Sequence, residues 1–186
     1  MIEHDNPYSK EELKKAALLL KENLFNFFQS IPENELFEYP QKGWSPAENI
    51  VHMNKVTKLL GLTFYSPKFI SNFFFGENKE KTSKPFSEIS DIYLKALKEG
   101  KDSGPFTPGK ENPLEKITKR KDEILSDWNK NLDKYSTVLE NWKEEDLDST
   151  LTLHPFLGKI TVREMYMIGI LHPVHHSSIV AERLEK

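Results

Sequence analysis

One helix-start pattern occurs four times in the sequence and limits the folds that the chain can adopt. In this pattern, the capping box, a side chain that can accept a hydrogen bond is followed three residues later by glutamate. The four pairs are Ser9 with Glu12, Ser45 with Glu48, Asn112 with Glu115, and Thr161 with Glu164. Proline follows the second and third caps, at the first helical position, where its missing N–H breaks no hydrogen bond. The sequence therefore predicts four long helices.

Hydrophobic residues recur at helical spacing after each of these starts. The predicted helices cover Leu13 to Ile31, Pro46 to Phe64, Leu114 to Leu139, and the segment that follows Thr161. Four long helices in 186 residues indicate an all-α fold built as a four-helix bundle. We expect a single domain over residues 1–186, because this length suits one sizeable core better than two small ones.

The connection between the second and third predicted helices is long and of different composition. It extends from Gly76 to Glu111 and is rich in glycine, proline, serine and lysine. Its middle, "FSEISDIYLKALKEG", favours a short amphipathic helix. A connection of this length allows helices two and three to run parallel, whereas shorter links favour antiparallel neighbours. This connection either forms a lid over a site or is a loop on the surface of the protein. Outside the helices, a short extended piece is expected only at "STLTLHPF".

Composition excludes several classes of function. The chain has no cysteine, which excludes disulfides, cysteine-based zinc sites and a thiol nucleophile. A net charge of -3 gives no electrostatic reason to expect a nucleic-acid or membrane partner. The longest apolar run, "MYMIGIL", is too short to cross a bilayer, and the first residues do not resemble a signal peptide. We expect a cytoplasmic protein.

The histidines are concentrated on hydrophobic helix faces. Three of the six lie in "LHPVHH", where His172 and His176 are four residues apart and so project from one side of a helix. His52 lies on the second predicted helix, between apolar residues and opposite its lysines. His175 is about a quarter turn away from the pair. Two predicted helices therefore direct imidazoles towards the interior.

These imidazoles allow two interpretations. Neutral imidazole is a good ligand for zinc, nickel, copper or iron, and an i,i+4 pair can chelate one ion. Three protein nitrogens would leave coordination positions open to water or substrate, as in catalytic sites. In the alternative, the histidines are buried and hydrogen-bonded to backbone carbonyls and to one another.

Two segments resemble the DinB/YfiT-like superfamily. "GWSPAENIVHM" is similar to the Trp-Ser-x-x-Glu-x-x-x-His start of that superfamily's second helix. "HPFLGKITVREMYMIGILHPVHHSSIV" is similar to its last segment, His-Pro-x-x-Gly-Lys-(Leu/Ile)-Thr followed by a helix with His-x-x-His-His. The resemblance implies a bundle in up-down-down-up order, with a divalent metal, usually zinc or nickel, held by three histidines. Carried over by position, the ligands are His52, His172 and His176.

The resemblance also suggests an activity. Known members include transferases and isomerases that act with low-molecular-weight thiols, and others are described as metal-dependent hydrolases. The resemblance implies that this protein is a metal-dependent enzyme, either a thiol S-transferase or a hydrolase. Such an enzyme would act on a small-molecule substrate and would need no side-chain nucleophile. The alternative is a non-catalytic binding or interaction bundle whose metal site is idle or structural.

Several further residues are candidates for a role in the site. Glu48 lies one turn before His52 and is the candidate catalytic base, although the capping box already explains it. Trp44 either lines the pocket mouth or packs beside the helix start. His154 either approaches the metal or stabilises the "HPFLGK" turn. His175 is expected beside the ligands or in the core.

Two basic residues and a proline near the last helix also affect the expected site. Arg163 and Lys159 could bind an anionic substrate at the positive end of this helix. Pro173 removes a hydrogen bond and crowds the carbonyl of Gly169, so a kink there would decide whether the two ligands converge. The aromatic cluster "FISNFFFG" is expected to end the second helix, and part of it could form a homodimer interface.

Overall fold

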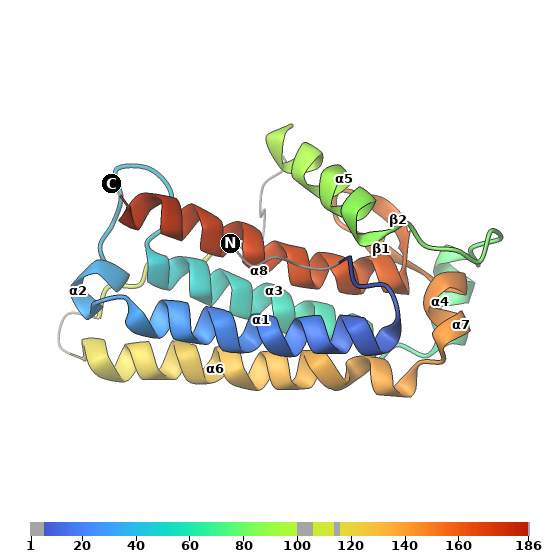
Figure 1. The fold of residues 1–186 in the computed structure, drawn as a ribbon, viewed down its shortest axis with the longest axis horizontal. Coiled ribbons are helices and arrows are strands. Elements are labelled where there is room, and N and C mark those ends of the chain that lie inside the picture. The colour runs from blue at the N-terminus through green and yellow to red at the C-terminus, as the bar shows by residue number, and fades with distance from the viewer. Residues whose placement is uncertain (1–5, 100–105, 114–115, 186) are drawn as a thin grey trace.

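The computed structural model describes residues 6–99, 106–113 and 116–185. Most of these residues are helical, and four long helices lie side by side (Figure 1). They are α1 (Lys10–Ser30), α3 (Pro46–Thr63), α6 (Ile117–Thr137) and α8 (Val162–Leu184). Both α6 and α8 pack against α1 and against α3. No helix in the described ranges is both long and apolar enough to cross a membrane.

Hydrogen bonds between helix ends show how the long helices are oriented. Lys121 Nζ, at the start of α6, donates to the carbonyl of Ile31 at the end of α1, at 2.7 Å. Arg183 Nη1, at the end of α8, donates to the carbonyl of Trp44 just before α3, at 2.7 Å. Trp142 Nε1, after α6, donates at 2.9 Å to the carbonyl that follows α3. Thus α6 is antiparallel to α1, α8 is antiparallel to α3, and α3 and α6 end together.

Three of the four predicted capping boxes form. In α1, α3 and α8 the cap hydroxyl accepts from the backbone of the glutamate, whose carboxylate accepts from the backbone of the cap. The third predicted start was wrong, since α6 begins at Ile117 after Lys116, which makes no side-chain cap bond. Of that predicted pair, Asn112 is not helical and Glu115 lies outside the described residues. The carboxylate of Glu111 accepts two hydrogen bonds from Arg120 at 2.7 Å, which hold the preceding segment beside the first turn of α6.

Between α3 and α6 the chain forms two helices, α4 (Lys68–Phe75) and α5 (Phe86–Lys98), of which only α5 lies within the predicted connection. The expectation that "FISNFFFG" ends the second helix was wrong, because α3 ends at Thr63 and α4 is separate from it. Pro67 is the N-cap of α4, and a proline disfavours helical conformation in the residue before it. The amphipathic helix predicted in the middle of the connection forms as α5, which packs on α8 (Figure 1).

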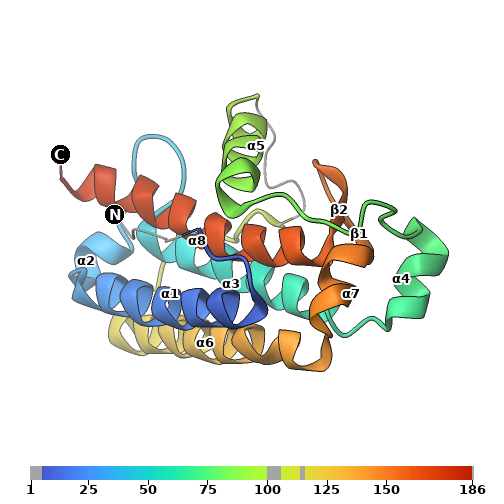
Figure 2. The same ribbon diagram turned by 45° about the vertical axis from the view of Figure 1, so that its right-hand side comes forward.

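A small two-stranded hairpin accompanies the helices of this mostly helical fold. Strands β1 (Leu151–His154) and β2 (Gly158–Thr161) pair antiparallel, with Leu151 opposite Thr161. The first matches the predicted extended piece, whereas the second was not predicted. The hairpin leads directly into α8 and lies near α5 and α4 (Figure 2). Three shorter helices, α2 (Glu33–Leu36), η2 (Val138–Asn141) and α7 (Glu144–Ser149), complete the described fold.

A tyrosine pair fills the space beside the glycine of α8. The rings of Tyr135 and Tyr166 stack with centroids 4.5 Å apart, and Tyr135 Oη donates to the carbonyl of Tyr166 at 2.8 Å. A Cβ on Gly169 would lie 1.9 Å from Tyr135 Oη. The missing side chain of Gly169 therefore makes room for a tyrosine hydroxyl. Helix α8 continues without interruption through Pro173.

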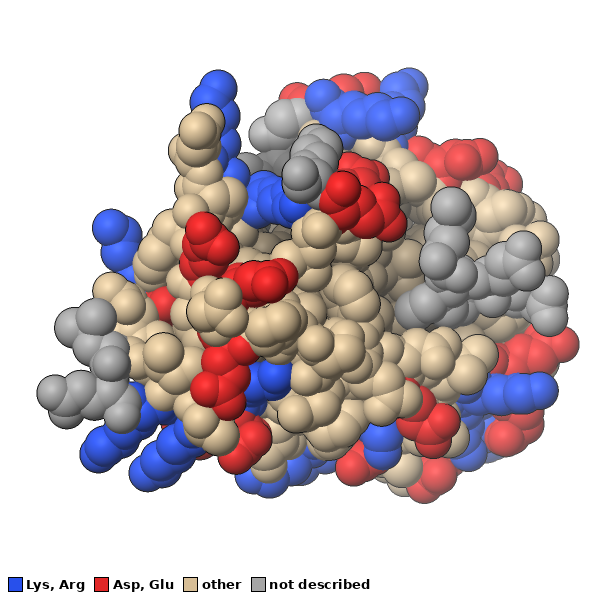
Figure 3. Space-filling model, turned by 60° about the vertical axis from the view of Figure 1, so that its left-hand side comes forward, with Lys and Arg blue, Asp and Glu red and all other residues tan. Residues whose placement is uncertain are grey.

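Charge is mixed on the surface. On the face shown in Figure 3, Lys and Arg side chains are interspersed with Asp and Glu side chains. This mixture agrees with the small net charge of -3. That face offers no continuous basic patch of the kind that binds a phosphate backbone.

Candidate metal centre

The structure brings together the three histidines that the sequence singled out. His52 comes from α3, and His172 and His176 come from successive turns of α8, which packs against α3. One ring nitrogen from each lies within 4.8 Å of the others, so the group could hold a metal ion. The Nε2 atoms of His52 and His172 are 2.9 Å apart. Both of these side chains are buried.

Hydrogen bonds define which nitrogen of two histidines is free. Nδ1 of His52 lies 2.9 Å from the carbonyl oxygen of Phe106 and must donate, because a carbonyl can only accept. Nδ1 of His176 lies 2.8 Å from Oδ1 of Asn49. The Asn49 amide is oriented by its Nδ2, which donates to the carbonyl of Ser45 at 2.9 Å. Both histidines therefore carry their proton on Nδ1 and present the Nε2 lone pair to the centre. Outer hydrogen bonds of this kind are typical of metal-bound histidines.

His172, the third histidine, has a ring nitrogen without a hydrogen-bond partner. Nδ1 of His172 is buried and has no hydrogen-bond partner among the described residues. Its Nε2 faces the lone pair of His52, so the 2.9 Å contact needs a proton or a cation between the two nitrogens. A divalent cation bound by both nitrogens would satisfy this contact, and so would a proton shared between them.

Burial keeps these imidazoles neutral. Burial lowers the pKa of His176 to about 3, with the neighbouring histidines acting in the same direction. Burial, and then the surrounding histidines, hold the pKa of His172 well below its ordinary value. Burial also lowers the pKa of His52. At neutral pH the cluster is thus uncharged, which is the form that binds a metal.

Trp44 covers the histidines on one side. Its ring stacks on that of His176, with centroids 5.8 Å apart and planes at 8°, and its centroid is 4.8 Å from that of His52. The tryptophan is half-buried and does not line the neighbouring cavity. The described contacts of its ring are those of packing against the histidine cluster.

A cavity of about 340 Å³ lies beside the cluster. All three histidines of the cluster line it, together with hydrophobic residues of α3, α5, β1 and α8. His154 and His175 also line it, so these two candidates lie near the cluster. His154 has the turn role as well, because its Nδ1 accepts from the backbone N–H of Leu157 at 3.3 Å.

Glu48 lies at the start of α3 and does not line the cavity. Its carboxylate accepts a hydrogen bond from the backbone N–H of Ser45 at 2.9 Å, which is its part in the capping box. The side chain is buried there. That Glu48 acts as a catalytic base stays a prediction.

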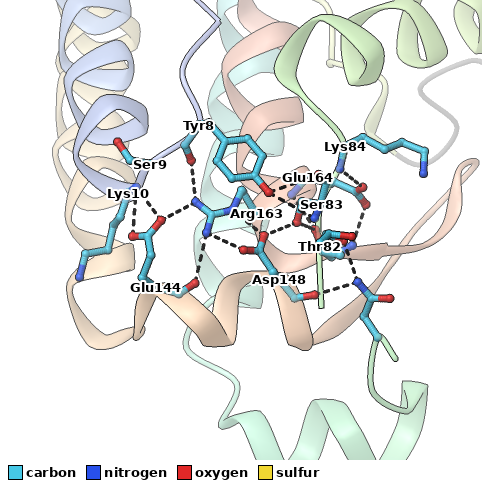
Figure 4. A network of polar contacts seen from close by, with 12 residues as sticks. Tyr8, Ser9, Lys10, Thr82, Ser83, Lys84, Glu144, Asp148, Arg163 and Glu164 are labelled. Carbon is cyan, nitrogen blue, oxygen red and sulfur yellow. Dashed lines mark hydrogen bonds and ion pairs between the residues drawn. The ribbon is translucent and has the colours of Figure 1, made fainter. Parts of the chain in front are cut away.

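Arg163, a candidate for binding an anionic substrate, has other partners in the structure. Its side chain is 1% exposed and donates to Asp148 at 2.6 and 2.9 Å and to Glu144 at 2.8 Å (Figure 4). A further bond runs to the carbonyl of Tyr8 at 2.6 Å. Lys159 instead donates to a backbone carbonyl at the end of α4. The guanidinium is therefore occupied by internal carboxylates and joins the N-terminal segment, α7 and α8.

Sequence reasoning missed two groups that support the histidines. Asn49 lies one turn before His52 and so on a related face of α3, a spacing that could have marked it as a second polar residue facing inwards. The carbonyl of Phe106 belongs to the long connection, and a backbone group carries no signal in the sequence. Both partners are far from their histidines along the chain, by 127 and 54 residues.

Comparison with known proteins agrees with this site. No curated protein matches the sequence. The sequence model of the DinB superfamily matches residues 19–180. This range includes α3, most of α8 and the three histidines. This match covers most of the chain, and the cluster is compatible with the divalent metal site that the resemblance implied. The protein therefore belongs to the DinB superfamily.

Proposed function

We propose that this protein is a metal-dependent enzyme in which His52, His172 and His176 bind one divalent cation, zinc or nickel. The observation that carries the proposal is the convergence of their ring nitrogens, with two Nε2 lone pairs directed inwards by outer hydrogen bonds. We further propose that the four long helices form a single domain, the up-down-down-up bundle of the superfamily. The absence of cysteine suits a reducing compartment, so a cytoplasmic location is part of the proposal.

A cation held there would supply Lewis-acid chemistry and polarise a thiol or a water molecule. Three protein nitrogens leave room for a small-molecule substrate on the cavity side. Asn49 and the carbonyl of Phe106 hold two of the rings in the tautomer that binding requires. Trp44 packs against the rings of His52 and His176 and does not line the cavity. The reaction is either thiol S-transfer, with a low-molecular-weight thiol as co-substrate, or hydrolysis.

Proton transfer is better assigned to the cavity histidines than to Glu48. Both His154 and His175 line the cavity, whereas the carboxylate of Glu48 is bound in the capping box. Burial lowers the pKa of His154 to about 4 and also lowers the pKa of His175. Nδ1 of His154 already accepts from Leu157, so neutral His154 carries its proton on Nε2 and can only donate there. Neutral His175 is then the imidazole that accepts a proton from a thiol or a water molecule.

One observation favours a second candidate, a non-catalytic bundle with an idle or structural site. If His172 carries its proton on Nε2, it donates to His52 across the 2.9 Å contact and needs no metal. The two candidates differ in turnover, and metal content separates the enzyme only from a bundle whose site is idle.

Elemental analysis of the purified protein is the first test. We expect about one zinc or nickel per chain, and none in the triple variant His52→Ala, His172→Ala, His176→Ala. His175→Ala is the control, because it removes a neighbouring imidazole that we do not assign as a ligand. If the wild type lacks metal and adding zinc or nickel does not raise its melting temperature above that of the triple variant, the metal site is rejected.

Activity is tested next with the metal-loaded protein. The substrates are 1-chloro-2,4-dinitrobenzene with a panel of small thiols, for S-transfer, and 4-nitrophenyl esters, for hydrolysis. We expect one of these activities and its loss in the triple variant. Turnover that survives loss of the three histidines contradicts the mechanism, and bound metal without any turnover favours the non-catalytic candidate.

A further inference from the structure

The cavity beside the histidine cluster has a distinctive chemistry. Among the described residues that line it, none is Lys, Arg, Asp or Glu. Its walls include Val56 and Leu60 of α3, Leu97 of α5, and Met165 and Ile168 of α8. A hydrophobic molecule that entered would release water from apolar surface on both sides.

The cavity contains no side chain that carries a permanent charge among the described residues. Outside the histidine cluster, the polar side chains that line it are those of Thr63, Tyr93, His154 and His175. The nearby Lys55 is exposed, donates to the carbonyl of Thr107 and does not line the cavity. A carboxylate or sulfonate buried in this cavity would find no described side chain of opposite charge. Burial of an unpaired charge is strongly unfavourable.

The rim of the cavity is also hydrophobic. Leu59 and Leu153 both line the cavity and are 42% and 56% exposed. A ligand that passes from solvent to the histidines therefore meets aliphatic side chains first.

The long connection builds one wall and so determines the shape of the cavity. Tyr93 and Leu97 of α5 line it, and so does Phe106. The ring of Tyr93 is stacked on that of Phe156, with centroids 5.9 Å apart, which holds α5 to the hairpin turn. The carbonyl of Phe106 is bound to His52, so this wall is attached to the cluster itself.

We propose that this cavity selects an uncharged, hydrophobic substrate and places its reacting group at the histidine cluster. Charged substituents, such as the carboxylates of a small thiol, remain outside the cavity. This inference rests on the proposed function, since it names the substrate class of that same site. Most of the lining residues belong to α3, α8 and the hairpin, and Tyr93, Leu97 and Phe106 come from the segment 76–111, for which the sequence predicted either a lid or a surface loop.

Two fluorescent probes test the charge preference. N-phenyl-1-naphthylamine is neutral, and 1-anilinonaphthalene-8-sulfonate has the same rings with one added negative charge. We expect saturable binding of the neutral probe at one site per chain. The sulfonate should bind at least about tenfold more weakly, because a tenfold ratio needs only 1.4 kcal/mol. Equal or stronger binding of the sulfonate overturns the inference.

Variants on α5 locate the bound probe. Leu97→Arg places a cation in the cavity wall, so it should weaken binding of the neutral probe and strengthen binding of the sulfonate. Leu94→Arg is the matched control, because Leu94 is on the same helix, is 40% exposed and does not line the cavity. Val56→Phe fills the cavity without adding charge and should weaken both probes, which keeps the test valid if Leu97→Arg does not fold.

Phe73→Ser excludes the exposed aromatic surface of α4 as the probe site. Phe73 is 83% exposed and does not line the cavity, so this change should leave binding unaltered. If Phe73→Ser abolishes binding while Val56→Phe does not, the inference is wrong. The titrations need no turnover and are run with and without zinc. Metal binding without probe binding therefore refutes the inference alone, whereas probe binding by a protein that takes up no metal refutes the proposed function.

Discussion

Nδ1 of His176 donates a hydrogen bond to Oδ1 of Asn49 at 2.8 Å, across the contact between α8 and α3. The amide of Asn49 is oriented by its own bonds to the backbone before α3, at 2.9 Å to Ser45 and 3.3 Å to Trp44. The start of one helix therefore sets the tautomer of a histidine on another. The capping region of α3 and the histidine cluster are parts of one hydrogen-bonded arrangement.

Replacing Asn49 should weaken metal binding. Asn49→Leu removes the acceptor for His176, and loss of such an outer partner typically lowers metal affinity about 10- to 100-fold. Ser45→Ala is the control, because it removes the helix cap, costs about 1 kcal/mol of stability and leaves His176 in place. Competition titration with a zinc indicator measures the affinities, and thermal melting without metal measures the stabilities. Equal affinity losses in the two variants would show that Asn49 acts only through stability.

Replacing Gly169 should destabilise the bundle. A Cβ there would meet the hydroxyl of Tyr135 at 1.9 Å, and overpacking of this kind costs about 1–3 kcal/mol. Gly61→Ala is the matched helix control, since a Cβ on Gly61 has no atom within 4 Å. Its higher helix propensity should leave stability unchanged or raise it. Urea denaturation checks both. Tyr135→Phe should partly rescue Gly169→Ala, and a complete lack of coupling between the two would contradict the packing argument.

His154 should make stability depend on pH in mildly acid solution. Burial lowers its pKa to about 4 in the folded state, while the unfolded value is near 6.5. The unfolded chain therefore binds the proton more tightly, and stability falls as pH drops from about 6.5 towards 4. The contribution is at most about 3 kcal/mol. Urea denaturation in EDTA at pH 7.5 and pH 5 should show a smaller loss for His154→Gln than for the wild type. Identical losses would indicate that the imidazole is not buried.

The Arg163 network should contribute strongly to stability and not to the site. Arg163→Met leaves Asp148 and Glu144 without their cation, and breaking a buried ion pair in this way costs about 3–5 kcal/mol. Lys159→Met, which removes an exposed lysine near the same helix start, should cost less than about 1 kcal/mol. Chemical denaturation measures both. If both variants lose stability equally, the network lacks the importance that its burial implies.

The aromatic surface of α4 should hold two copies of the chain together. Phe69, Phe73 and Phe74 are 72%, 83% and 68% exposed, and adjoining exposed aromatic side chains favour association. Size-exclusion chromatography with light scattering should show a homodimer. The double variant Phe69→Ser, Phe73→Ser should be a monomer with an unchanged melting profile after dilution. A monomeric wild type at high concentration would exclude this interface.

Short-range features of the fold could be read from the sequence. The capping boxes that begin α1, α3 and α8 depend on side chains three residues from the groups they bind. The pairing of His172 with His176 depends on a separation of four residues, about one helical turn. Helix α5 was predicted for the same reason, since its hydrophobic face repeats over a few residues. The predicted start of α6 failed where the chain before that helix is held by Arg120. The resemblance to a known family, rather than local spacing, connected His52 with the other two histidines.

Only the tertiary structure decided which groups form hydrogen bonds to the histidines of the site. The carbonyl of Phe106 and the amide of Asn49 reach their histidines from 54 and 127 residues away, and neither has a local signature. From the sequence, Arg163 was a candidate for binding an anion. In the folded protein its guanidinium forms ion pairs with Asp148 and Glu144. The physical reason is that local hydrogen bonds and helical periodicity are encoded within one or two turns. Burial, tautomer and partner depend on which distant segments pack together.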